Sequence, residues 1–277
     1  MKRQGYREQT ITRYARVLRN LSRTASLVDG EEVKQAIADR SWTDGTKELA
    51  CDAYSLLAKS KGFSFERPRY KGTEQLPFIP LEQEIDALIS GTGPKTSAVL
   101  QLLKETAARI GEALGLKWSD VDFERCTITL TPEKNSKPRQ FKISPKLVSM
   151  LNRLEKKNTF LFGGSSADKF RRNYQQQRNR LVMKLANPRL HQIKLHTFRH
   201  WKATYEYNRT KDILYVMGFL GHKSISNTLK YTQLVDWKTE EYVCKIAKSL
   251  DEASNLIEAG FEYVTEMADI KLFRKRK

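Results

Sequence analysis

The chain has 277 residues, 39% hydrophobic and 30% charged, a composition typical of a globular protein with one or two hydrophobic cores. Its 50 lysines and arginines outnumber 32 acidic residues, and the resulting net charge of +18 favours nucleic acid over an anionic membrane surface as a partner. No stretch approaches the apolar length of a membrane span, and no apolar segment follows the basic N-terminus, so we expect no membrane span, no signal peptide and a cytoplasmic location.

Helical periodicity dominates the N-terminal part of the chain. Apolar residues recur at helical spacing in three stretches, at residues 6–23, 29–40 and 43–62. The next segment contains three prolines and no helical stripe, which indicates a linker ending near residue 73. We therefore predict two domains, a small helical domain at residues 1–72 and a larger domain at residues 73–277.

The larger domain is predicted to be mostly α-helical with a small β-sheet. In residues 126–144, β-branched and polar residues alternate on both sides of the turn-forming segment KNSKP, which predicts a β-hairpin. After residue 239 the pattern predicts a strand, a helix and one or two further strands. Helices are expected at residues 80–91, 95–116, 146–157, 166–186, 196–208 and 225–235.

One short segment concentrates groups that handle protons and negative charge. In HTFRH, the side chains of His196, Arg199 and His200 have the spacing i, i+3 and i+4, which places them on one face of a helix. His200 either supports Arg199 or is an ordinary core histidine, and the sequence leaves both readings open.

Three separated segments resemble the tyrosine recombinases, also called phage-type integrases, in a form similar to archaeal members. TAARIGEALGLKWSDVDF resembles the first arginine box of that family, with Arg109 in the catalytic position. HTFRH resembles its His-x-x-Arg box and supplies His196 and Arg199. LGHKSISNTLKYT resembles its closing box, with His222 and, nine residues later, the nucleophile Tyr231.

The resemblance covers roughly residues 80–235 and implies a fold and an activity. The fold would be a helical core-binding domain joined to an α+β catalytic domain, which together bind double-stranded DNA. The activity would be site-specific recombination or integration, as in mobile elements: strands are cleaved through a 3′-phosphotyrosyl intermediate and then rejoined. A homo-oligomer, tetrameric in the synaptic complex, is also implied.

The chemistry of the matched side chains agrees with this reaction. Guanidinium groups bind phosphate oxygens in a bidentate manner, so Arg109 and Arg199 would stabilise the charge that develops on the phosphate. A tyrosine hydroxyl has a pKa of about 10 and needs a base. His196 could accept its proton, while His222 could hydrogen-bond the phosphate.

The leaving 5′ oxygen needs a proton, which a hairpin lysine could donate. Lys134 best matches the family's hairpin lysine, and Lys137 is the second candidate.

The resemblance implies no cofactor and no metal, and the three cysteines lack a metal-binding spacing. The alternative functions are a type IB topoisomerase that relaxes DNA and a DNA-binding accessory protein without catalysis.

Overall fold

The computed structural model describes residues 1–72, 75–132, 136–234, 242–267 and 270–276. The chain divides into two compact units, Met1–Gln75 and Leu76–Lys277, where the sequence predicted a boundary after residue 72. In the described part of the chain, no helix is long and apolar enough to cross a membrane.

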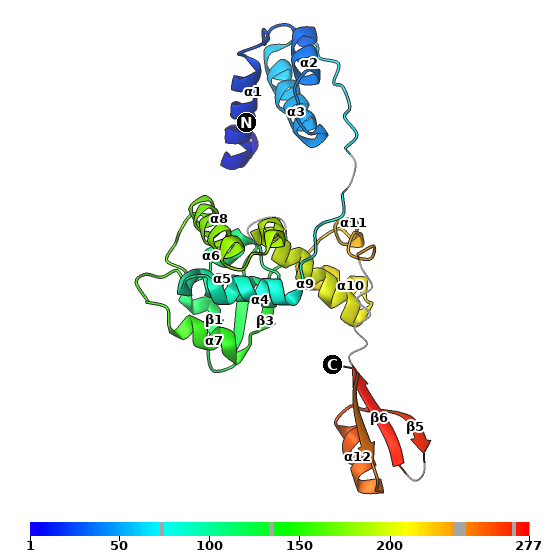
Figure 1. Ribbon diagram of the computed structural model, residues 1–277. Coiled ribbons are helices and arrows are strands. Elements are labelled where there is room, and N and C mark those ends of the chain that lie inside the picture. The colour runs from blue at the N-terminus through cyan, green and yellow to red at the C-terminus, as the bar shows by residue number, and fades with distance from the viewer. Residues whose placement is uncertain (73–74, 133–135, 235–241, 268–269, 277) are drawn as a thin grey trace. The chain divides into compact units, whose positions relative to one another are not determined.

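The N-terminal unit is a bundle of three helices, as the periodicity predicted (Figure 1). Helices α1 (Glu8–Leu21), α2 (Gly30–Ala38) and α3 (Asp44–Lys61) bury a common core that includes Leu21, Ile37 and Tyr54. Asp29 caps α2 by accepting hydrogen bonds from two backbone N–H groups of its first turn. α3 ends at Gly62, whose left-handed φ of 77° suits glycine.

The C-terminal unit is built around one almost fully buried helix, α5 (Pro94–Thr106), which contacts α4, α6, α7 and α9. Its other helices are α4 (Glu82–Gly91), α6 (Ile110–Leu114), α7 (Pro145–Asn152), α8 (Ala167–Lys184), α9 (Leu195–Thr210), α10 (Ile213–Leu220) and α11 (Ser226–Leu229). Strands β1 (Val121–Asp122), β2 (Thr127–Leu130) and β3 (Arg139–Lys142) form an antiparallel sheet in that order. The two predicted hairpin strands are therefore confirmed, with Leu130 paired to Arg139.

The sequence predicted one helix over residues 95–116, and this prediction is wrong. The chain leaves α5 at Ala107, which adopts a left-handed φ of 52°, and re-enters a helix only at Ile110. The break frees the Ala107 carbonyl, which accepts a hydrogen bond from Nη1 of Arg199 at 2.7 Å. A contact 92 residues away in sequence thus helps to stabilise a backbone conformation that alanine disfavours.

The helix predicted at residues 225–235 is also shorter than expected. It ends at Leu229, and the backbone N–H of Tyr231 bonds the Thr228 carbonyl three residues back, which is the pattern of a tight turn. Further along, strand β4 (Tyr242–Ala247), helix α12 (Leu250–Glu258) and strands β5 (Glu262–Met267) and β6 (Ile270–Arg276) match the predicted order, with two final strands. The three strands form an antiparallel sheet of order β4-β6-β5, and Phe273 of β6 packs with Ala253 of α12 in a small buried cluster.

Candidate active site

The helix break before α6 sets the position of Arg109. Arg109 is the residue that precedes α6, and its Nη1 donates to Oε1 of Glu112 at 2.9 Å and to Oγ of Ser136 at 2.6 Å. The Glu112 carboxylate also accepts the Arg109 backbone N–H, at 3.0 Å. The arginine side chain is therefore held at both ends, while about a quarter of it stays exposed.

Arg199, on α9, is near Arg109 but more deeply buried, with only 2% of the residue exposed. Its guanidinium donates to the carbonyl oxygen of Ala107 at 2.7 Å and to that of Leu220 at 2.6 Å. Burial, together with the nearby charges of Arg109 and Arg139, lowers the pKa of Arg199 to about 9. An anion bound here would relieve the repulsion among these cations.

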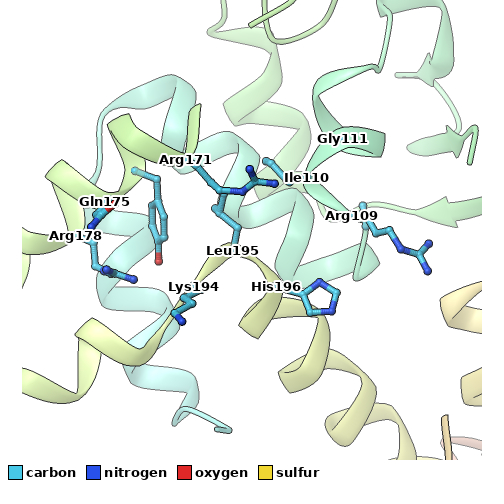
Figure 2. A pocket seen from close by; sticks show the side chains of 11 residues that line it. Arg109, Ile110, Gly111, Arg171, Gln175, Arg178, Lys194, Leu195 and His196 are labelled. Atoms are coloured by element: carbon cyan, nitrogen blue, oxygen red, sulfur yellow. The ribbon is translucent and has the colours of Figure 1, made fainter. Parts of the chain in front are cut away.

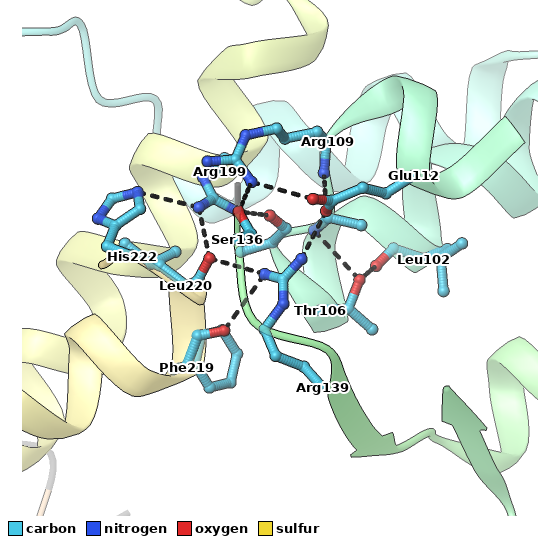
Figure 3. Close-up of polar contacts among 12 residues, drawn as sticks. Leu102, Thr106, Arg109, Glu112, Ser136, Arg139, Arg199, Phe219, Leu220 and His222 are labelled. Carbon is cyan, nitrogen blue, oxygen red and sulfur yellow. Dashed lines mark hydrogen bonds and ion pairs between the residues drawn. The ribbon is translucent and has the colours of Figure 1, made fainter. Parts of the chain in front are cut away.

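His222 is oriented by two hydrogen bonds, one at each ring nitrogen, and Figure 3 shows the one to Arg199. Nη2 of Arg199 lies 3.0 Å from Nε2, and because a guanidinium can only donate, Nε2 must be the acceptor. Nδ1 therefore carries the proton and donates to Oγ1 of Thr228 at 2.9 Å. Burial and the charge of Arg199 lower the pKa of His222 to about 4, so the ring is neutral at physiological pH.

A third arginine, Arg139 at the start of β3, completes the cluster and was missed by the sequence reading. It is 8% exposed, and its Nη2 lies 2.6 Å from Oε2 of Glu112. Its Nη1 donates to the Leu220 carbonyl at 2.8 Å, the same oxygen that Arg199 contacts. Gly221 is required beside it, because a Cβ there would lie 3.0 Å from Nε of Arg139 and the φ is +67°.

Tyr231 is almost completely buried, at 1% exposure, among Ala203, Val216 and Leu220. Its hydroxyl oxygen lies 3.0 Å from Nδ1 of His200. Burial raises the pKa of Tyr231 to about 12, although Arg199 and Arg109 act in the opposite direction. The sequence reading had left His200 undecided, and the structure places it in contact with the tyrosine.

A pocket of about 560 Å³ opens beside Arg109 (Figure 2). His196 and Arg109 lie on one side of it, and the other cationic side chains that line it come from α8 and the start of α9. Among the residues that the structure describes, none that lines the pocket is acidic, so the pocket favours an anionic ligand. Its charged and ionisable lining residues are Arg109, Arg171, Arg178, Lys194 and His196.

The structure thus gathers Arg109, Arg199 and His222 around one centre, with His196 in the adjoining pocket. Lys134 lies outside the described residues. The hairpin segment that follows it does reach the site, since Ser136 contacts Arg109 and the backbone N–H of Lys137 lies 3.4 Å from the Gly221 carbonyl. Among the described residues, no three His, Cys, Asp or Glu side chains are grouped to bind a metal ion.

Comparison with known proteins gives one consistent result. The sequence profile of the phage integrase family matches residues 81–237, a span that includes every predicted catalytic residue. Tyrosine recombinase XerA of Pyrococcus furiosus is 28% identical over 225 residues, which cover 76% of this chain and 74% of that protein. The integrase of Escherichia phage P2 is 28% identical over 67% of this chain, which spans about half (53%) of that integrase.

Solved structures agree at the level of the fold. The Tn1549 transposon integrase in complex with transposon right end DNA aligns with a TM-score of 0.62 and 18% identity, covering 92% of this chain and 94% of that one. XerH site-specific recombinase bound to its palindromic difH substrate aligns with a TM-score of 0.57 and 19% identity, covering 83% and 72%.

Proposed function

The chain belongs to the phage integrase family, and from this premise we propose that it is a tyrosine-type site-specific recombinase that cleaves and rejoins double-stranded DNA. One observation carries the proposal. The charges of Arg109 and Arg199 act to lower the pKa of the buried Tyr231, and the pocket that Arg109 and His196 line has no acidic side chain among the described residues.

The two arginines would bind the scissile phosphate. Phosphodiester attack builds negative charge on the non-bridging oxygens, and guanidinium groups fixed in advance stabilise that charge without reorganising. Arg199 is fixed by two backbone carbonyls and Arg109 by Glu112. His222, neutral with Nε2 toward Arg199, would be a further hydrogen-bonding group at the phosphate.

Tyr231 would attack the phosphorus and release the 5′ oxygen, which takes its proton from the hairpin lysine that we assign to Lys134. The phosphotyrosyl bond conserves the energy of the broken phosphodiester, so the proposed reaction needs no cofactor. His196, in the pocket beside Arg109, was predicted from the sequence as the acceptor of the tyrosine proton.

The N-terminal unit is proposed to bind duplex DNA as a core-binding domain. Four arginines of α1 and the turn after it are exposed, and their spacing of three or four residues places them on one side of the helix. Such a stripe can contact a series of phosphates. These residues are Arg13, Arg16, Arg19 and Arg23.

We further propose that the protein acts in the cytoplasm as a homo-oligomer, tetrameric when two DNA sites are paired.

A plasmid assay tests the proposal against its two rivals. The protein first selects its own binding site from random duplexes, and two copies of that site are then placed in a supercoiled plasmid. We expect deletion or inversion between the sites, with protein linked covalently to DNA in trapped reactions. Relaxation of plasmids without any site would indicate a topoisomerase, and binding without breakage would indicate an accessory protein.

A further inference from the structure

The hydroxyl of Tyr231 is enclosed by protein rather than by solvent. The residue is 1% exposed, and the hydroxyl oxygen lies 3.0 Å from Nδ1 of His200, which is a hydrogen-bonding distance. Bulk water has little access to remove its proton. A base for this tyrosine must therefore come from the side chains packed against it.

The two histidines of α9 occupy different positions. The ring of His200 is close to the rings of both Tyr231 and His196, with centroid distances of 5.9 Å and 4.6 Å respectively. His196 is exposed and lines the cationic pocket with Arg109. His196 is thus placed toward the side from which a phosphate would enter, and His200 toward the nucleophile.

The surroundings of His200 keep its ring neutral. Burial lowers its pKa to about 3, and the positive charges that face it, from His196 when protonated, Lys230 and Arg199, act in the same direction. A neutral ring protonated on Nε2 has a free lone pair on Nδ1, directed at the tyrosine hydroxyl. A bound DNA phosphate would offset the positive charges and so raise the proton affinity of His200 when the attack occurs.

We infer that His200 is the proton acceptor for Tyr231, which leaves His196 to contact the phosphate. The inference rests on the proposed function. In the step, the Oη–H bond breaks and the proton moves to Nδ1 of His200, while a bond forms between Oη and phosphorus. The bond from phosphorus to the 5′ oxygen breaks, and that oxygen takes the proton of the hairpin lysine.

The test is the single-turnover rate of covalent adduct formation on a nicked duplex that loses its short fragment. His200→Asn retains an acceptor oxygen near the position of Nδ1 but cannot take up a proton, and His200→Ala removes the group. Both should slow the adduct by about 100-fold or more, the usual effect of losing a general base, with DNA affinity and melting temperature close to wild type. His191→Asn, at an exposed histidine of the 3₁₀ turn Pro188–Gln192, is the matched control and should react at the wild-type rate.

Two further measurements distinguish a His200 that accepts the proton from a His200 that only positions the ring of Tyr231. Added imidazole should accelerate His200→Ala and leave the wild type unchanged. A substrate with sulfur at the 5′-bridging position should not rescue either variant. The sulfur leaves without a proton, so the substrate removes the need for an acid, but Tyr231 still needs a base.

If His200→Asn forms the adduct at the wild-type rate, His200 only positions Tyr231. If His200→Ala forms the adduct faster than wild type, the contact between His200 and Tyr231 inhibits the nucleophile before DNA binds. Either result overturns the inference while the wild-type adduct stands. If the wild-type protein itself forms no adduct, the proposed function fails, and the inference fails with it.

Discussion

Arg139 and Glu112 form an ion pair whose side chains are 5% and 0% exposed, with Nη2 and Oε2 2.6 Å apart. The pair joins the β-hairpin to the first arginine box. Through its other nitrogen, Arg139 also reaches the Leu220 carbonyl in the closing box. A single side chain outside the matched boxes therefore connects three segments that supply the proposed catalytic groups.

Removing this arginine should destabilise the fold strongly. Arg139→Met keeps much of the volume but leaves the Glu112 carboxylate with one cation fewer and the Leu220 carbonyl with one donor fewer. We expect a loss of about 3 kcal/mol in the free energy of unfolding, the usual effect of breaking a buried pair. Urea denaturation measures it, and Lys157→Ala, which removes an exposed ion pair with Glu155, should cause no measurable change.

A second substitution sharpens the same test. Adding Glu112→Leu to Arg139→Met removes the unbalanced carboxylate, so the double variant should lose less stability than the two single losses added together. Strict additivity would show that the two side chains are not energetically coupled.

The sequence identifies candidate residues with reactive groups more readily than the side chains that support them. Arg109, Arg199, His222 and Tyr231 were identifiable because their chemistry and order match a family pattern. Arg139 was not, because an arginine at the start of a strand normally points to solvent, and only the fold shows that Glu112 and the Leu220 carbonyl enclose it.

The same limit applies to the backbone around Ala107. Local propensity favours an unbroken helix through TAARIGEAL, since alanine, leucine and glutamate are good helix formers. The break is accompanied by the hydrogen bond from Arg199, which no local pattern contains. The periodicity of the N-terminal helices, in contrast, arises from a simple apolar face, and it predicted all three of them.

Lys134 and Lys137 should differ in their effect on cleavage. If Lys134 donates the proton to the leaving oxygen, Lys134→Ala should slow cleavage by about 100-fold or more, and Lys137→Ala far less. A 5′-bridging sulfur substrate should restore cleavage by Lys134→Ala, because a thiolate leaves without a proton. Gel analysis of single-turnover cleavage measures both, and equal effects of the two substitutions would remove the assignment.

Binding to duplex DNA should weaken steeply as salt rises, because lysine and arginine contacts to phosphates release counterions. Replacing Arg13, Arg16 and Arg19 of α1 with glutamine should reduce the slope of log K against log salt by about 3. The same three positions changed to lysine should retain the slope. Fluorescence anisotropy over a salt series measures it, and an unchanged slope in the glutamine variant would exclude α1 from the DNA contact.

The central claim is that Tyr231 is the nucleophile, and mapping of the covalent adduct tests it most directly. With a nicked duplex, wild-type protein should become attached to the DNA 3′ end, and mass spectrometry of the linked peptide should locate the bond at Tyr231. Tyr231→Phe should bind DNA with unchanged affinity and form no adduct, whereas Tyr215→Phe, at a partly exposed tyrosine of α10, should form it normally. An adduct that persists in Tyr231→Phe, or that maps to another tyrosine, would contradict the proposed active site.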